Sequence, residues 1–202
     1  MTRKPLPARR PIQLIRLVLW LLVAVAIAGT LALVFLAPGK KMTASAIGGP
    51  FSLVDQNGAT VTEAALKGHP SLMFFGYTFC PDVCPTTLLS ASNWLKALGP
   101  DGDRLKVYFV TVDPERDTVS QMKAYLQAFD PRIVGLSGDR PAIDATIKAY
   151  RAYAKKVPLK DGDYTMDHTA LVYLMDKDGS FIGAFNIEQA PAQAAAEWLR
   201  HS

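Results

Sequence analysis

The segment Cys80–Pro85 lies between an apolar run and a helix-like segment, and no other feature constrains the fold of this chain as strongly. It contains the only two cysteines among 202 residues. The preceding run Leu72–Tyr77 predicts a buried strand, and Thr86–Leu98 after it has the pattern of a helix. A cysteine turn that opens a helix is typical of reactive thiols, because free N–H groups and the helix dipole favour the thiolate. The arrangement predicts an α/β fold with its chemistry at the end of a central strand.

The two cysteines admit more than one role. In a helical turn Cys80 and Cys84 lie at positions i and i+4 on one face, where their sulfurs could form a disulfide or share a soft metal ion. The alternative is a pair of inert buried cysteines or a structural bridge. A disulfide that closes so small a loop adds little chain-entropy stabilisation. The strand–cysteine–helix context therefore favours reactive thiols.

The first 41 residues form a separate region. Leu17–Leu36 contains twenty residues without a charge, which is enough to cross a hydrocarbon core of about 30 Å as a helix. Five basic residues precede this run and two follow it, so the positive-inside bias places the N-terminus in the cytoplasm. We expect a basic cytoplasmic tail at 1–16, a single transmembrane anchor at 17–36 in the inner membrane, a linker at 37–50 and a periplasmic domain at 51–202.

A cleaved signal peptide is the alternative explanation of this region. Signal-peptide apolar runs span about 7 to 15 residues, so this run is long for one. Ala44-Ser45-Ala46 resembles a cleavage site but lies well beyond the apolar run. The length favours a retained anchor, and in either case the domain is exported to a space where a disulfide is chemically allowed.

The basic character of the chain belongs to its N-terminal region. Seven of the 22 Lys and Arg residues lie in the first 41 positions, where there is no acidic residue; the remainder carries 15 basic and 18 acidic residues, a net charge of −3. The domain therefore offers no argument for binding nucleic acid.

Strands and helices alternate after the cysteine segment, and a hairpin and a helix close the chain. Asn57-Gly58 predicts a hairpin turn before the central strand. The later segments are expected to be strands at Leu105–Val112 and Ile133–Leu136, helices at Val119–Phe129 and Pro141–Tyr153, a polar loop at Lys155–Asp167, hairpin strands at Ala170–Met175 and Phe181–Phe185, and a helix at Pro191–Arg200. This order predicts a thioredoxin-like α/β domain with the cysteines at the carboxyl end of its first central strand.

A third ligand would turn the two sulfurs into a defined metal site. His201 is the penultimate residue, and His69 precedes the central strand at the end opposite the cysteines. His168 follows the loop Lys155–Asp167, which is long for a connector, and the neighbouring Asp167 could orient its ring. The alternative is a histidine that is only hydrogen-bonded at a strand start. The residues alone leave both roles open.

The chain contains, in this order, the segments Gly76–Leu88, Thr111–Thr118 and Tyr164–Thr169. Together they resemble the Sco/SenC family of copper proteins, which assemble cytochrome c oxidase. The likeness extends over the domain from about Phe51 onward, and an N-terminal membrane anchor also fits the family. It implies a thioredoxin-like fold with an N-terminal transmembrane helix.

The resemblance also implies a site and partners. One copper ion per domain, as copper(I) or copper(II), would be held by Cys80, Cys84 and His168. Phe79 stands where some members carry a histidine, and Thr169 stands where a serine is common; the three-ligand pattern is intact. The implied task is that of a copper metallochaperone, a thiol–disulfide reductase, or both, acting on cytochrome c oxidase subunit II. A copper donor chaperone is the second implied partner.

Asp113 ends the second predicted central strand, so we expect it near the cysteine turn. There it could tune the acidity of the thiols or help to dock a partner. The alternative is an aspartate that organises the turn after the strand. Because the segment Thr111–Thr118 is part of the resemblance, the functional role is the stronger interpretation.

Two other functions compete with copper delivery. A general periplasmic thiol–disulfide oxidoreductase usually spaces its cysteines as C-x-x-C, whereas three residues intervene here. A thiol peroxidase needs an accessible cysteine of low pKa, with Cys84 as the resolving partner. We expect a copper chaperone more than an enzyme, and a copper spectrum lost on replacing His168 would separate it from both alternatives.

Overall fold

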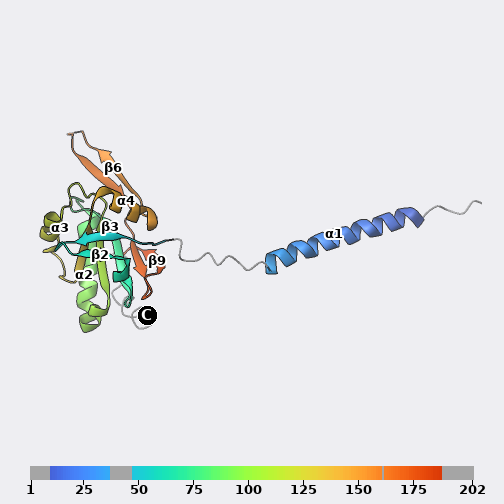
Figure 1. Ribbon diagram of the computed structural model, residues 1–202, viewed down its shortest axis with the longest axis horizontal. Helices are drawn as coiled ribbons and strands as arrows, with labels where there is room; N and C mark the ends of the chain where they lie inside the picture. Colours follow the sequence, from blue (N-terminus) through green and yellow to red (C-terminus); the bar gives the residue numbers. More distant parts are fainter. Residues whose placement is uncertain (1–9, 37–46, 161, 188–202) are drawn as a thin grey trace, which may run out of the picture. The chain divides into compact units, whose positions relative to one another are not determined.

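The first unit of the chain, Met1–Thr43, includes the helix α1 (Arg10–Leu36). The computed structural model describes residues 10–36, 47–160 and 162–187. Within these ranges no helix is both long and apolar enough to cross a membrane. The second unit, Ala44–Ser202, contains the other elements (Figure 1).

A seven-stranded mixed sheet forms the core of the second unit. Its strands lie in the order β2 (Thr60–Thr62), β1 (Ser52–Asp55), β5 (Ile133–Ser137), β4 (Lys106–Thr111), β3 (Ser71–Gly76), β8 (Val172–Met175) and β9 (Phe181–Phe185). The central strands β5, β4 and β3 are parallel, and the outer strands pair antiparallel. All six residues of β3 are buried, which explains its uninterrupted apolar sequence.

In the described part of this unit, three α-helices and two short 3-10 helices connect the strands. They are α2 (Val83–Leu98), α3 (Val119–Leu126), α4 (Arg140–Ala149), η2 (Glu63–Leu66) and η3 (Gly99–Arg104). The hydroxyl of Thr118 accepts from the N–H of Gln121 and caps α3, and the Asp139 carboxylate accepts from the N–H of Ala142 and caps α4. Helices α3 and α4 end earlier than the sequence predicted.

The expected loop at Lys155–Asp167 is instead largely a hairpin. Strands β6 (Ala154–Pro158) and β7 (Tyr164–His168) form a separate two-stranded sheet. Lys155 and Lys156 are both exposed, so the strand lacks the apolar alternation that would have revealed it. His168 consequently ends β7 and does not open the next strand. The helix expected at Pro191–Arg200 lies outside the described residues.

Candidate metal centre

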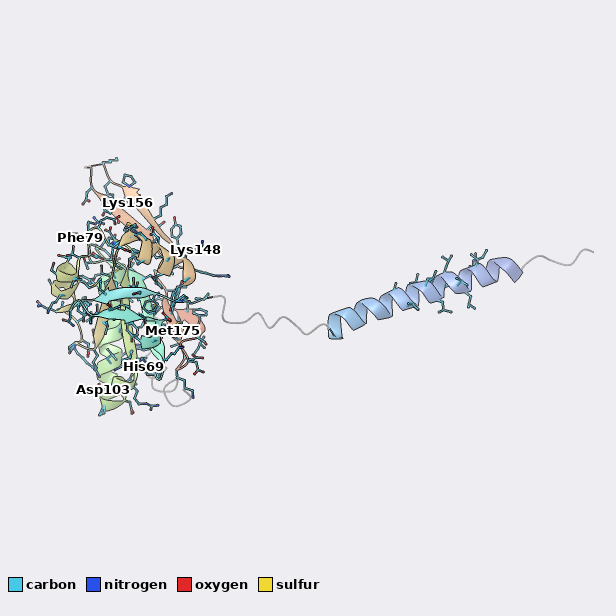
Figure 2. The ribbon with its side chains drawn as sticks, in the orientation of Figure 1. His69, Phe79, Asp103, Lys148, Lys156 and Met175 are labelled. Carbon is cyan, nitrogen blue, oxygen red and sulfur yellow. The ribbon has the colours of Figure 1, made fainter. Side chains whose placement is uncertain are left out.

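The cysteine turn lies where the central parallel strands end. Gly76, the last residue of β3, pairs with Thr111, the last residue of β4, so the segments after both strands meet at one edge of the sheet. His69, which precedes β3, lies at the other end of the sheet from Phe79, which follows it (Figure 2). This position confirms that His69 is remote from the cysteines.

Gly76 allows the second cysteine to approach the sheet. A Cβ atom at this position would lie 2.7 Å from Cys84 Sγ and 2.7 Å from an edge carbon of Phe109. Both neighbours are fully buried, so neither can move aside freely. The absence of a side chain on residue 76 therefore creates the space for the sulfur.

Three donor atoms from two distant segments converge at this edge. Sγ of Cys80, Sγ of Cys84 and a ring nitrogen of His168 all lie within 4.8 Å of one another. Nε2 of His168 is 3.5 Å from Cys84 Sγ, and the N–H of Cys84 donates to Cys80 Sγ over 3.4 Å. Two thiols and one imidazole form a donor set that suits soft and borderline metal ions.

The hydrogen bond between the two cysteine side chains shifts their pKa values in opposite directions. The Cys84 thiol donates to Cys80 and lowers the pKa of Cys80 to about 3, and His168 adds to this effect, while burial opposes it. Donation to Cys80, burial and the negative charge of the Cys80 thiolate together raise the pKa of Cys84. The metal-free site therefore holds one thiolate and one thiol.

The ring of His168 is fixed in an orientation that directs one nitrogen at the sulfurs. Nδ1 donates to the carbonyl oxygen of Thr169 at 3.0 Å, which leaves Nε2 facing Cys84. The rings of Phe74 and Tyr77 pack edge-on against the imidazole, at centroid distances of 6.1 and 5.7 Å. A carbonyl partner on one ring nitrogen is the usual arrangement for a histidine that binds metal through the other.

The charge state of His168 depends on its thiolate neighbour. Burial acts to lower the pKa of the imidazole, but hydrogen bonding to Cys80 and to the Thr169 carbonyl outweighs it and raises the pKa above its ordinary value. The resulting ion pair stabilises the metal-free fold below the ordinary histidine pKa, and this contribution is lost as pH rises through the raised pKa. Metal binding at Nε2 must displace the proton.

Asp117 anchors the cysteine turn and was not recognised in the sequence. Its carboxylate accepts from the N–H and hydroxyl of Thr78 and from the hydroxyl of Thr111. Its backbone carbonyl accepts from the hydroxyl of Ser137. One buried residue thus joins the segments at the ends of β3, β4 and β5. Burial raises its pKa, and hydrogen bonds from Thr111 and Thr78 oppose the rise.

The two candidate aspartates lie in different environments. Asp113 is fully buried, and its carboxylate accepts from Arg116 Nε at 2.5 Å and from the Tyr164 hydroxyl at 2.9 Å. Asp167 is exposed on β7, beside His168. A cavity of about 240 Å³ opens at the site, with a lining that includes Cys80, His168 and Asp167.

A family model and two relatives in sequence identify the kind of protein. Residues 39–201 match the model described as SCO1/SenC. The chain belongs to the SCO1/SenC family. It is 38% identical over 145 residues to protein SCO1 homolog 1, mitochondrial, of Arabidopsis thaliana; the match covers 71% of this chain and 43% of that relative, less than half of its length. It is 36% identical over 157 residues to a SCO2-like protein of Rickettsia conorii, covering 77% and 76% of the two chains.

Solved structures confirm the thioredoxin-type α/β fold. The structure of Bradyrhizobium japonicum ScoI with copper bound is 60% identical, with a TM-score of 0.73, and the match covers 77% of this chain and 99% of that chain. Yeast Sco1 with copper bound is 35% identical, with a TM-score of 0.70 and coverages of 78% and 90%. These family members bind copper on a fold like this one.

Proposed function

We propose that this protein binds one copper ion through Cys80, Cys84 and His168 and delivers it during assembly of the dinuclear copper centre of cytochrome c oxidase subunit II. The observation that carries the proposal is the convergence of the three donor atoms within 4.8 Å. Thiolates suit copper(I), and imidazole suits both oxidation states of copper. The copper-bound relatives support the choice of metal.

The different pKa values of Cys80 and Cys84 support a second activity, thiol–disulfide exchange. Both cysteines are free in this structure, and Cys80 is the half-buried thiolate while Cys84 is the buried thiol. In an exchange with a partner disulfide, Cys80 would attack one sulfur, and Cys84 would then attack the mixed disulfide, lose its proton and release a reduced partner. The copper-centre cysteines of the oxidase subunit must be reduced before copper enters, so the two activities serve one task.

We further propose that residues 17–36 anchor the protein in the inner membrane, with residues 1–16 in the cytoplasm and the domain from residue 51 in the periplasm. The uncharged run of twenty residues and the five basic residues before it support this topology. An anchored domain would meet membrane-bound oxidase subunits and a copper donor chaperone on the same side of the membrane.

A copper titration of the full-length protein, reduced and under anaerobic conditions, tests the proposal. We expect one equivalent of copper per chain for the wild type and loss of stable binding in Cys80→Ala and Cys84→Ala, because each sulfur is a donor. His69→Ala is the control, since this histidine lies at the opposite end of the sheet. Full binding in either cysteine variant would overturn the proposal.

A further inference from the structure

The hairpin that carries His168 lies outside the seven-stranded sheet. Strands β6 and β7 pair only with each other within the described part of the chain. His168 is therefore not held in place by the backbone ladder that positions the cysteine turn. Its position over the sulfurs must depend on contacts between the hairpin and its surroundings.

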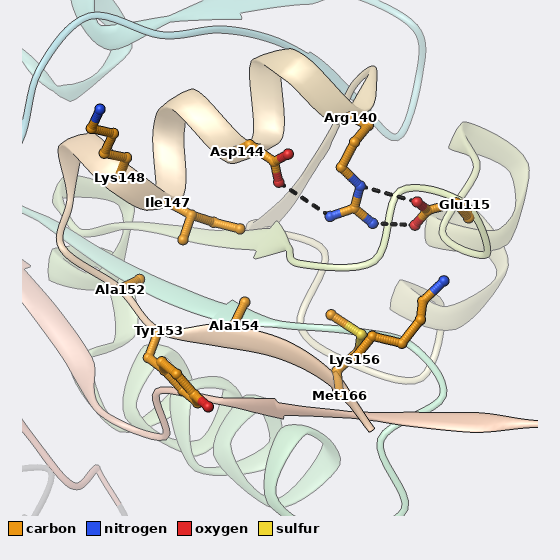
Figure 3. A pocket seen from close by; sticks show the side chains of 10 residues that line it. All are labelled: Glu115, Arg140, Asp144, Ile147, Lys148, Ala152, Tyr153, Ala154, Lys156 and Met166. Atoms are coloured by element: carbon orange, nitrogen blue, oxygen red, sulfur yellow. Dashed lines mark hydrogen bonds and ion pairs between the residues drawn. The ribbon is translucent and has the colours of Figure 1, made fainter. Parts of the chain in front are cut away.

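One side of the hairpin faces a cavity of about 530 Å³ (Figure 3). Met166 and Lys156 line it from the hairpin, and the opposite wall includes Arg140, which is paired with Glu115 and Asp144. A gap of this size means that the hairpin and α4 are not closely packed there. Support for the hairpin must come largely from another side.

The hydroxyls of Tyr77 and Thr165 are hydrogen-bonded at 2.7 Å and supply part of that support. The rest comes from a cluster of three side chains, Asp113, Arg116 and Tyr164, which we call the clasp. Nη1 of Arg116 donates to the backbone carbonyl of Tyr164 at 3.0 Å, and the guanidinium carbon lies 3.8 Å from the centroid of the Tyr164 ring. Both Arg116 and the Tyr164 hydroxyl donate to the fully buried carboxylate of Asp113. The first residue of β7 is thereby fixed to the loop that follows β4.

The guanidinium of Arg116 also touches the cysteine turn. It lies 4.9 Å from the ring centroid of Phe79, which precedes Cys80, and 5.6 Å from that of Tyr77, whose ring packs against His168. Within the described residues its Nη2 is buried and has no hydrogen-bond partner. A buried donor without a partner carries a desolvation cost, which the stacking and the ion pair on the same guanidinium must offset.

We propose that Arg116 is a positioning residue that holds the β6–β7 hairpin against the cysteine turn and thereby keeps Nε2 of His168 over the two sulfurs. The inference rests on the proposed function in one respect, because the clasp matters for copper only if His168 is a ligand. It predicts that loosening the clasp acts like a partial loss of His168 while leaving both cysteines in place.

The test compares clasp variants with matched controls in the full-length protein. Arg116→Ala and Tyr164→Ala remove two of the three members. Arg132→Ala is the matched arginine control, because it also breaks an ion pair with a buried aspartate, Asp130, but at the start of β5. Tyr153→Ala removes an exposed tyrosine immediately before β6 and outside the clasp.

Two measurements give the result. Hydrogen-exchange mass spectrometry of the metal-free protein should show loss of protection in β7 for both clasp variants and neither control. Copper(II) affinity should fall by about 10–100-fold in the clasp variants, the usual effect of losing a group that orients a ligand. Copper(I) affinity should change little, since both sulfurs remain.

Each outcome decides the inference. Unchanged β7 exchange and unchanged copper(II) affinity in both clasp variants would overturn it, and copper binding by the wild type would still support the proposed function. If the wild type binds no copper, the proposed function fails. Hydrogen exchange of β7 alone then shows whether the clasp holds the hairpin in place. If Arg116→Ala does not fold, Tyr164→Ala decides, because it leaves the ion pair between Arg116 and Asp113 intact.

Discussion

Replacing Gly76 with alanine probes the close approach on which the site depends. The added Cβ would lie 2.7 Å from both Cys84 Sγ and a Phe109 ring carbon, 0.7 Å short of the 3.4 Å at which ordinary contact begins. Overpacking of this kind costs about 1–3 kcal/mol. Alanine also restricts the backbone of the unfolded chain, which raises the free energy of unfolding by about 0.4–1 kcal/mol. We therefore expect a net loss of stability of roughly 1–2 kcal/mol.

Urea denaturation of the reduced, metal-free protein measures this loss as a lower midpoint at constant slope. Gly183→Ala is the matched control, because a Cβ at this position in β9 would meet no atom within 4 Å. The control should be as stable as the wild type or slightly more so. Equal midpoints for the two variants, together with unchanged copper affinity in Gly76→Ala, would refute the account of how the sulfur is placed.

Three further predictions follow from the site and the N-terminal region. The rate of alkylation of Cys80 in the metal-free protein, followed by mass spectrometry, should stay nearly constant from pH 8 down to pH 5, because the pKa of Cys80 is about 3. A steep fall of the alkylation rate over that range would show a thiol of ordinary pKa instead. Asp117→Ala should lower stability by about 1–3 kcal/mol, since the buried N–H of Thr78 loses its acceptor, and an unchanged urea midpoint would contradict this role. Deleting residues 1–36 should release the domain from the membrane fraction, whereas a native soluble protein that begins near Ile47 would show cleavage instead.

The sequence predicted the parts of the fold that carry strong local signals. The buried run of β3, the hairpin of β1 and β2 and the helix after the cysteines all follow from apolar patterning and turn residues. The hairpin of β6 and β7 was missed because its exposed lysines hide the alternation. The position of this hairpin beside the main sheet involves tertiary contacts, such as that of Arg116 with Tyr164, that no local pattern records.

The candidate site was predicted residue by residue, but its supports were not. Residue type and the family resemblance both pointed to Cys80, Cys84 and His168. The structure brings these three side chains together. Asp117 was overlooked because a charged residue in a polar turn predicts exposure, whereas here three hydrogen bonds to Thr78 and Thr111 compensate its burial.

X-ray absorption at the copper edge tests the central claim most directly, because it identifies the atoms bound to the metal. For the copper(I)-loaded, full-length protein we predict two sulfur scatterers and one imidazole, from Cys80, Cys84 and His168. In His168→Ala the imidazole contribution should disappear and both sulfur contributions should remain. A wild-type spectrum with fewer than two sulfurs, or an imidazole signal that persists in the variant, would contradict the account.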